Sequence, residues 1–270
     1  MKYIDVKNYA QTILDVVKAT PKRGALWIMT MGDDPASASY VKGKIKDCEA
    51  CGIEYKHHKV RTPEELSWLI MQGNCDPKVG GIIVQLPLPD DINADDFTQL
   101  VRRDKDVDGF REDSDHDECT PEGIMHILYN ELGDLTGKRA LIIGRGELVG
   151  IPMVARLLVA NCTVTIAHSK TTNLDELLAS SEIIVSAAGR AGLVDLYKCT
   201  NAEVVVDVGV NRNAEGKLCG DCFNFSDYYL PNLKVTPVPG GIGLMTRAML
   251  MSHMIDKGAV ESASELRGKK

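Results

Sequence analysis

The chain lacks a long hydrophobic run, an excess of positive charge, an internal repeat and a low-complexity linker. No apolar run approaches the roughly 20 residues that a transmembrane helix needs, so we expect no membrane partner. The first residues, Met1 to Asp5, lack the apolar region of a signal peptide, and we expect a cytoplasmic protein. The formal net charge of −7 argues against a nucleic-acid partner, although it leaves room for a local basic pocket that binds a nucleotide.

The bulk composition is that of an ordinary globular protein, with 44% hydrophobic and 26% charged residues. A length of 270 residues suffices for one large domain or two modest ones. The eight cysteines include two C-x-x-C pairs, Cys48 with Cys51 and Cys219 with Cys222, a spacing that zinc sites use. The first pair lies in an expected helix, and the second is far away in sequence. We therefore expect reduced, mostly buried thiols and no metal.

Short apolar runs alternate with segments of helical periodicity, which is the pattern of βαβ units and a parallel sheet. We expect an α/β protein of two lobes, with the last helix packing back on the first lobe. Strands are predicted over residues 25–31, 53–60, 81–86, 139–144, 163–167, 182–186 and 203–207. Helices are predicted over residues 4–17, 34–51, 149–160 and 244–255, and others begin at residues 62 and 120.

Several local signals set the expected boundaries of these elements. Asp34 followed by a proline supplies an N-cap and a first helical residue, and Gly52 ends that helix. Thr62 and Glu65 are spaced as a capping box. The continuous apolar run at 81–86 predicts a strand that is covered on both faces. The polar stretch at 104–118 breaks the alternation and is our candidate hinge.

The stretch at 235–243, Val-Thr-Pro-Val-Pro-Gly-Gly-Ile-Gly, is the most distinctive part of the chain. Its two prolines stiffen the backbone, and its three glycines allow the backbone to lie close to a ligand. The helix expected next would direct free backbone N–H groups at this loop, which suits a flat, polar, partly anionic molecule. A tight structural turn is the alternative interpretation.

A second glycine-rich loop lies between an expected strand and an expected helix. It has the spacing G-x-G-x-x-x-G and contains Gly144, Arg145, Gly146 and Gly150. Such loops hold a pyrophosphate at a helix N-terminus, so we predict a dinucleotide site. The next strand leads to Ser169 and a lysine instead of the acidic residue typical of NAD enzymes. With Arg145, these groups favour NADP over NAD. A solvated strand end is the alternative.

Four further residues are candidates for chemistry. Tyr40 and Lys44 are four residues apart in one expected helix and therefore share a face. A lysine that acts as a base must be neutral part of the time, which burial and a neutral partner such as Gln85 would favour. Asp108 supplies a carboxylate that can accept from a ring N–H and an amino group. An ordinary amphipathic pair and an ordinary Asp-Gly turn are the alternatives.

Taken together and in this order, these motifs resemble the bifunctional methylenetetrahydrofolate dehydrogenase/methenyltetrahydrofolate cyclohydrolase family. The resemblance covers nearly the whole chain. The motifs that carry it are Ser37-Ala38-Ser39-Tyr40-Val41 with Lys44, Val84-Gln85-Leu86-Pro87-Leu88-Pro89, Lys105-Asp106-Val107-Asp108-Gly109, Cys119-Thr120-Pro121, Gly144-Arg145 with Val149-Gly150-x-Pro152, His168-Ser169-Lys170-Thr171 and Thr236-Pro237-Val238-Pro239-Gly240-Gly241.

The resemblance implies oxidation of 5,10-methylenetetrahydrofolate with NADP, followed by hydrolysis to 10-formyltetrahydrofolate. This chemistry belongs to one-carbon metabolism and purine biosynthesis. It implies a catalytic domain over 1–118, on which 246–270 packs, and an NADP-binding Rossmann domain over 119–245. Folate would lie in the cleft between them, and the protein would be a homodimer with tetrahydrofolate derivatives as its small-molecule partners.

The resemblance also implies a role for particular residues. Lys44 matches the catalytic lysine, Gln85 the glutamine that positions it, Tyr40 the tyrosine that stacks on the folate, and Asp108 the carboxylate that holds the pterin. The implied folate loop contains Pro237, Gly240, Gly241 and Ile242. The implied cofactor contacts are Gly144, Arg145, Gly146, Ser169 and Val210.

The sequence departs from the family pattern at three places. The segment between Gly109 and Cys119 is shorter and more acidic than is usual, which puts the local wall of the site in doubt. Gly146 stands where a serine is usual, so one hydroxyl donor to the cofactor phosphate is missing. Leu244 stands where a proline is usual, and we expect that change to be mild.

Two other interpretations remain open at the level of sequence. A shikimate-type NADP dehydrogenase also pairs a lysine with a carboxylate, but it lacks the proline-glycine loop and the surroundings of Gln85. A non-enzymatic NADP-binding regulator would have no need of Lys44, Gln85 and Asp108 together. Assays with each substrate separate the three possibilities.

Overall fold

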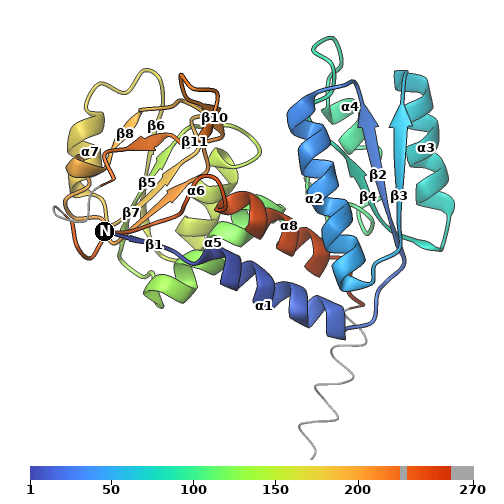
Figure 1. The fold of residues 1–270 in the computed structure, drawn as a ribbon, viewed down its shortest axis with the longest axis horizontal. Helices are drawn as coiled ribbons and strands as arrows, with labels where there is room; N and C mark the ends of the chain where they lie inside the picture. The colour runs from blue at the N-terminus through green and yellow to red at the C-terminus, as the bar shows by residue number, and fades with distance from the viewer. Residues whose placement is uncertain (226–229, 257–270) are drawn as a thin grey trace, which may run out of the picture. The chain divides into compact units, whose positions relative to one another are not determined.

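The computed structural model describes residues 1–225 and 230–256 and divides the chain into two compact units (Figure 1). Unit 1 comprises Met1–Ala10 with Thr120–Thr246, and unit 2 comprises Gln11–Cys119 with the chain from Arg247 onward. The predicted α/β fold of two lobes is confirmed. What we expected of residues 257–270 lies outside the described residues. Helices α1, α5 and α8 carry residues of both units, and they span Val6–Ala19, Cys119–Leu132 and Ile242–Ser252.

Unit 2 contains a three-stranded parallel sheet in the order β3-β2-β4. Helices α2 and α3 lie on opposite faces of this sheet (Figure 1). Every residue of β4 is buried, as its continuous apolar sequence predicts. The elements are β2 (Ala25–Met31), α2 (Pro35–Cys51), β3 (Tyr55–Val60), α3 (Pro63–Cys75), β4 (Val79–Val84) and α4 (Asp95–Thr98).

The helices of unit 2 begin and end where their capping residues predict. The Asp34 carboxylate accepts from the backbone N–H of Ser37 at 2.6 Å, and Gly52 ends α2 with a φ of 67°. The Thr62 hydroxyl accepts from the backbone N–H of Glu65 at 3.2 Å. The reciprocal half of the expected capping box differs, because the Glu65 carboxylate accepts from the N–H of Arg61 and not from that of Thr62.

Unit 1 contains a six-stranded sheet in the order β1-β13-β9-β7-β5-β6, and all of its pairs are parallel. The three central strands β9, β7 and β5 are almost wholly buried. The sheet strands are β1 (Lys2–Tyr3), β5 (Arg139–Ile143), β6 (Thr163–Ala167), β7 (Ile183–Ser186), β9 (Val204–Asp207) and β13 (Lys234–Val235). The other elements are α6 (Gly150–Val159), α7 (Leu174–Ser180), the 3-10 helix η1 (Leu196–Lys198), β8 (Val194–Asp195), β10 (Asn211–Arg212), β11 (Leu218–Cys219) and β12 (Cys222–Phe223).

The N-terminal residues correct the helix expected over 4–17. The helix begins at Val6, and Met1–Ala10 lie in unit 1. The reason is the short strand β1, which pairs with β13 by donating from Lys2 N to Leu233 O at 2.8 Å. Two residues are too few to give a strand pattern in a sequence.

Each unit has its own hydrophobic core. In unit 2 a cluster around Met29, Ile70 and Ile82 fills the space between the sheet and α3. In unit 1 a cluster around Leu141, Ile184 and Val205 lies on the parallel sheet. Among the described residues, no helix is long and apolar enough to span a bilayer.

Candidate functional site

The buried amine of Lys44 is the centre of the polar site in unit 2. Lys44 lies in the middle of α2 and is 2% exposed. Its Nζ lies 3.5 Å from Asp108 Oδ2 and 5.3 Å from the centre of the Tyr40 ring. The structure therefore brings together three of the four residues that we singled out for chemistry. Because this position is shielded from water, the lysine and the carboxylate attract each other strongly.

Gln85 directly follows the last residue of β4, but its contacts differ from those we expected. Its Nε2 donates to the backbone oxygen of Leu86 at 2.7 Å, and the Ser37 hydroxyl of α2 donates to the same oxygen at 3.2 Å. The charged partner that Lys44 contacts is Asp108, whereas we had expected the neutral Gln85. Gln85 Oε1 is buried and has no hydrogen-bond partner among the described residues. An unpaired buried amide oxygen costs about 1–3 kcal/mol, so it is suited to accept from a bound molecule.

An ion pair one turn beyond Lys44 was not predicted from the sequence. Arg247 Nε donates to Asp47 Oδ2 at 2.6 Å, and both side chains are largely buried. A Cβ at Gly43 would overlap the Arg247 guanidinium, so a larger residue there would force the Arg247 side chain to shift. The two partners are 200 residues apart in sequence, and periodicity gives no signal for such a contact.

Asp108 is carried by a segment that runs along β4 like a further strand. Ile82 forms a parallel bridge with Asp106, and its N–H donates to Lys105 O at 2.8 Å. Lys105, Asp106 and Asp108 are all buried. We expected residues 104–118 to be a hinge, but the structure places the whole segment inside unit 2 and buries its first half. Three ionic side chains within four residues concealed this burial in the sequence.

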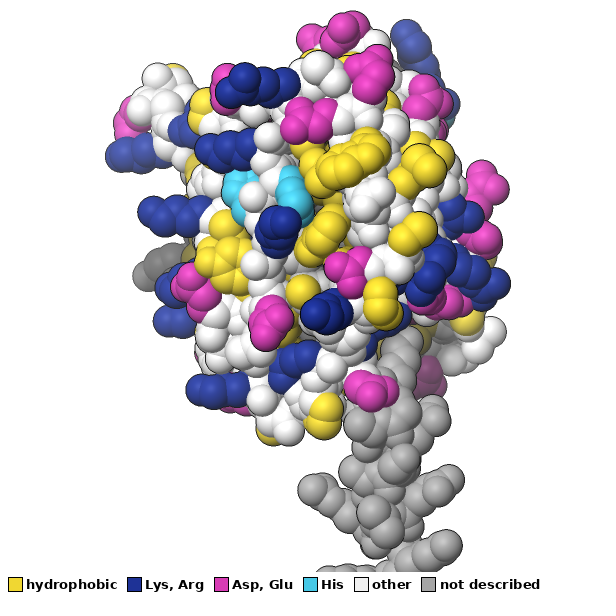
Figure 2. Space-filling view, turned by 90° about the vertical axis from the view of Figure 1, so that its right-hand side faces the viewer, with side chains coloured by type: hydrophobic (Ala, Val, Ile, Leu, Met, Phe, Trp, Pro, Cys, Tyr) yellow, Lys and Arg dark blue, Asp and Glu magenta, His cyan; other side chains and the backbone are white. Residues whose placement is uncertain are grey.

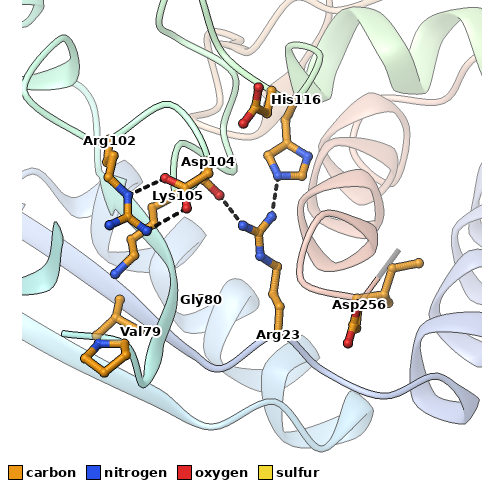
Figure 3. Close-up of a pocket in the computed structure, with 11 residues that line it drawn as sticks. Arg23, Val79, Gly80, Arg102, Asp104, Lys105, His116 and Asp256 are labelled. Atoms are coloured by element: carbon orange, nitrogen blue, oxygen red, sulfur yellow. Dashed lines mark hydrogen bonds and ion pairs between the residues drawn. The ribbon is translucent and has the colours of Figure 1, made fainter. Parts of the chain in front are cut away.

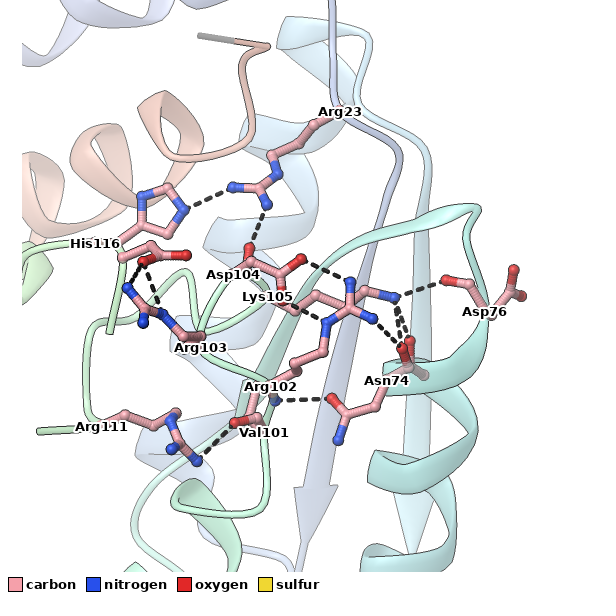
Figure 4. Close-up of polar contacts among 12 residues, drawn as sticks. Arg23, Asn74, Asp76, Val101, Arg102, Arg103, Asp104, Lys105, Arg111 and His116 are labelled. Atoms are coloured by element: carbon pink, nitrogen blue, oxygen red, sulfur yellow. Dashed lines mark hydrogen bonds and ion pairs between the residues drawn. The ribbon is translucent and has the colours of Figure 1, made fainter. Parts of the chain in front are cut away.

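A network of cations fixes the same segment (Figure 4). Arg102 donates to both carboxylate oxygens of Asp104, and this bond lowers the pKa of Asp104 below its usual value. Arg23 donates to the backbone oxygen of Asp104 and contacts His116 Nε2 at 2.7 Å. Lys105 Nζ donates to three backbone oxygens at the end of α3, and burial lowers its pKa. These contacts set the position from which Asp108 reaches Lys44.

A pocket lined by residues of unit 2 is separate from the Lys44 site (Figure 3). It has a volume of about 600 Å³ and is lined by Arg23, Arg102 and Lys105, among others. It also contains Val79, the first residue of β4, whereas Gln85 follows the last residue of that strand. The pocket and the Lys44 site therefore lie at opposite ends of β4. Its cations already donate to protein groups, so they offer little charge to a ligand.

In the glycine loop of unit 1, neighbouring backbone segments lie so close that two positions have no room for a side chain. Gly144 follows β5 with a φ of 110°, and a Cβ there would overlap the backbone oxygen of Ala187. A Cβ at Gly150, the first residue of α6, would overlap the backbone oxygen of Gly144. Gly146 is different, because a Cβ there would have no atom within 4 Å. The serine usual at that position would fit, and its absence removes a hydroxyl without a steric reason.

Exposed polar groups surround this loop at the carboxyl ends of the strands. Arg145 is exposed, and so are Ser169 and Lys170, which follow β6 next to β5 in the sheet. Val210 follows β9 and is 72% exposed. Ligands of parallel sheets bind at the carboxyl ends of the strands. The cationic groups therefore lie where the phosphates of a dinucleotide would be expected.

The proline-glycine loop follows β13 at the same edge of the sheet. The Thr236 hydroxyl at its base accepts from Asp207 N at 2.8 Å. Gly240 has a φ of 93°, and a Cβ at Gly241 would overlap the backbone oxygen of Pro237. Gly240 is exposed, whereas Ile242 is buried as the first residue of α8. The loop is thus tightly folded, and its role in binding stays a prediction.

Two models of sequence families match the chain. Residues 4–108 match the catalytic domain of tetrahydrofolate dehydrogenase/cyclohydrolase, and residues 118–262 match the NAD(P)-binding domain of the same enzymes. The chain is also 41% identical over 276 residues to Bifunctional protein FolD 2 of Ectopseudomonas mendocina, covering 94% of this chain and 91% of that protein.

Two solved structures give the same result. The bifunctional enzyme FolD of Campylobacter jejuni, a methylenetetrahydrofolate dehydrogenase/cyclohydrolase, is 36% identical with a TM-score of 0.86, covering 96% of this chain and 98% of that one. The corresponding Trypanosoma brucei enzyme, solved with NADP cofactor and an inhibitor, is 26% identical with a TM-score of 0.87, covering 97% of this chain and 98% of that one.

Proposed function

This chain belongs to the tetrahydrofolate dehydrogenase/cyclohydrolase family, and from that membership we propose a bifunctional enzyme of one-carbon metabolism. It oxidises 5,10-methylenetetrahydrofolate to the 5,10-methenyl compound with NADP, and it then hydrolyses that compound to 10-formyltetrahydrofolate. The observation that carries the assignment of the site is the buried contact between Lys44 and Asp108.

Unit 1 has the features that a dinucleotide requires. The backbone positions at Gly144 and Gly150 leave no room for a Cβ, and the first turn of α6 presents its N–H groups beyond them. We assign Gly144, Arg145 and Gly146 to the phosphates, Ser169 to the ribose end and Val210 to the opposite end of NADP. When bound, NADP supplies the acceptor of the hydride. Arg145 and Ser169 supply the preference for its 2′-phosphate over the hydroxyl of NAD.

The folate assignments use the hydrogen-bonding capacity of the site in unit 2. Asp108 can accept from the pterin amino group and the adjacent ring N–H, and Tyr40 offers a ring against which the substrate stacks. Gln85 Oε1 is available to accept from the lysine or from the substrate. We also assign the loop that contains Pro237, Gly240, Gly241 and Ile242 to folate, because its backbone can approach a flat ring closely.

In the hydrolytic step Lys44 moves the proton. Water adds to the methenyl carbon, and Lys44, in the neutral form that the positively charged methenyl ring favours, takes a proton from that water. The five-membered ring then opens to the formyl product. Asp108 holds the amine in place for this transfer, and the buried Gln85 Oε1 is the proposed second acceptor for it. A shikimate-type dehydrogenase and a non-enzymatic regulator are the weaker hypotheses, because the family membership accounts for both units together.

A spectrophotometric assay of three lysine variants tests this function. Wild-type protein should reduce NADP faster than NAD in the presence of methylenetetrahydrofolate and should hydrolyse the methenyl compound. Lys44→Met should lose cyclohydrolase activity by roughly 10²–10⁴-fold, the usual contribution of a general acid–base group. Lys44→Arg keeps the charge beside Asp108 but does not release its proton at neutral pH, so it should be equally inactive.

The exposed Lys46 of the same helix gives the matched control, and Lys46→Met should retain both activities. Unchanged NADP affinity in all three variants would show that unit 1 remains folded. Wild-type rates of methenyl hydrolysis in Lys44→Met would remove this lysine from the mechanism. Hydride transfer from shikimate, with none from methylenetetrahydrofolate, would overturn the proposed function itself.

We further propose that the protein is a homodimer formed through α3. Trp68 and Met71 are 59% and 61% exposed, and their spacing places them on one face of this helix. Figure 2 shows hydrophobic side chains gathered on the side of unit 2 that carries α3 and β3. Exposed apolar patches of this kind mark association sites, and a two-fold axis would bring the same patch of a second copy against it.

Light scattering after size-exclusion chromatography tests the dimer. Trp68→Glu should shift the mass toward the monomer, because two buried charges would face each other across the axis. Val159→Glu is the control, since Val159 is 85% exposed on α6 of unit 1 and should leave the mass unchanged. A dimer that survives Trp68→Glu would place the interface elsewhere.

We place the enzyme in the cytoplasm, where it would supply formyl groups to purine biosynthesis. Eight cysteines that are all unpaired thiols support a reducing compartment.

A further inference from the structure

A fully buried carboxylate joins the loops at the carboxyl edge of the unit 1 sheet. Asp221 lies between β11 and β12. Its Oδ2 accepts from the Ser186 hydroxyl at 2.8 Å and from Ala188 N at 3.0 Å. Its Oδ1 accepts from Arg190 N at 2.7 Å and from Asn211 Nδ2 at 2.9 Å. These four bonds use the full accepting capacity of a carboxylate and connect the segment after β7 to the segment after β9.

A second buried carboxylate holds Asp221 in this position. Asp207, the last residue of β9, accepts through Oδ1 from Gly209 N and from Asp221 N, each at 3.0 Å. Its Oδ2 accepts from Cys222 N at 2.9 Å. Burial raises the pKa of Asp207 above its usual value. The backbone is fitted to both acids, because a Cβ at Gly209 would overlap the Asp221 carboxylate and one at Gly220 would overlap that of Asp207.

The occupied lone pairs exclude a metal-binding role for this pair. Seven hydrogen bonds from seven residues, all from N–H or O–H donors, reach the four carboxylate oxygens. A cation would find these oxygens already surrounded by the positive ends of donor dipoles. The acids therefore fix the positions of the backbone segments that donate to them.

The strand order of the sheet indicates which function these backbone segments serve. The phosphates bind at the loop after β5, and the 2′-phosphate end extends toward Ser169 after β6. In the order β9-β7-β5-β6, the other end of the dinucleotide must extend across the ends of β7 and β9. These are the two loops that Asp221 holds. The loop after β7 also touches the phosphate loop, where Gly144 lies against the backbone oxygen of Ala187.

We infer that Asp221 is a positioning residue for NADP, and that its hydrogen bonds hold the loops at 187–190 and 208–211 in the shape that receives the nicotinamide end of the cofactor. The inference rests on the proposed function, since it concerns the cofactor of that reaction. It gives a role to the buried acid between Cys219 and Cys222, two residues whose C-x-x-C spacing alone would suggest a metal site. Ser186 and Asn211 act through Asp221, because both donate to it.

Calorimetric titration with NADP tests the inference directly and needs no folate. Asp221→Asn replaces an acceptor by an NH₂ group that faces N–H donors, so the dissociation constant for NADP should rise about tenfold or more. Ser186→Ala removes one of the four bonds and should shift the constant in the same direction by less. Asp195→Asn is the control: this acid also accepts from a backbone N–H and an asparagine in unit 1, and neither donor belongs to these loops.

The two activities provide the second measurement. The cyclohydrolase assay starts from the methenyl compound and uses Lys44 and Asp108 of unit 2, so Asp221→Asn should slow the dehydrogenase and leave the cyclohydrolase unchanged. An unchanged dissociation constant for NADP, or an equal fall of both activities with a lower melting temperature, would show that Asp221 only stabilises the fold. A wild-type protein that binds NADP but oxidises no folate would instead overturn the proposed function. The effect of Asp221→Asn on NADP affinity would then still test the inference.

Discussion

The contact between Lys44 and Asp108 illustrates what a single residue does in this protein. Both side chains are almost wholly buried, and their charged atoms lie 3.5 Å apart. Removing one partner of such a pair leaves an uncompensated charge, which costs about 3–5 kcal/mol of stability. Asp108 therefore has two roles: it holds the substrate, and it balances the charge of Lys44. A single substitution would affect both roles at once.

A set of three variants separates these roles. Asp108→Asn should weaken folate binding about tenfold or more, because the amide places a donor against the donors of the pterin. It should also lower the melting temperature, because Lys44 loses its counter-ion. The double variant Lys44→Met with Asp108→Asn should recover the melting temperature. It should still bind folate more weakly than Lys44→Met alone, as titration calorimetry can measure.

The affinity for NADP serves as the control, since it depends on unit 1 and should stay the same in all three proteins. If the double variant binds folate as tightly as Lys44→Met, the only role of Asp108 is to balance the lysine.

At the scale of elements, the sequence predicted those with strong local signals. Helix α2 begins after Asp34 and ends at Gly52 as expected, and the buried strand β4 follows from its apolar run. The motifs also located Lys44 and Gln85. What the sequence could not predict depends on contacts between distant residues: the short strands β1 and β13, the partner of Lys44, and the Asp221 network. None of these leaves a period in the sequence, because each is formed by one or two residues.

The N-cap of α3 allows a prediction at this scale. Thr62→Ala removes the hydroxyl that accepts from Glu65 N and should destabilise unit 2 by about 1 kcal/mol. Urea unfolding followed by tryptophan fluorescence is the measurement, because both tryptophans, Trp27 and Trp68, belong to unit 2. Thr62→Ser keeps the hydroxyl and should remain near wild type. An equal loss in the serine variant would attribute the effect to the methyl group instead of the cap.

At the scale of the whole molecule, the cysteines report on the packing of both units. Six are buried, Cys219 is partly exposed, and Cys75, at the end of α3, is exposed. Burial raises the pKa of Cys48 in unit 2 and of Cys199 in unit 1 to about 12. The thiolate is the reactive form, so these two are protected both by exclusion of the reagent and by their ionisation.

Alkylation of the native protein with iodoacetamide at about pH 8, close to the usual pKa of a free thiol, should therefore proceed in stages. Intact-mass spectra should show one rapid adduct, which peptide mapping assigns to Cys75, and a slower second adduct at Cys219. The six buried cysteines should react only when urea unfolds the chain. Cys75→Ser is the control and should abolish the rapid adduct alone. Adducts at Cys48 or Cys199 that form as fast as the one at Cys75 would mean that the cores of these units open readily in the native protein, contrary to the packing described.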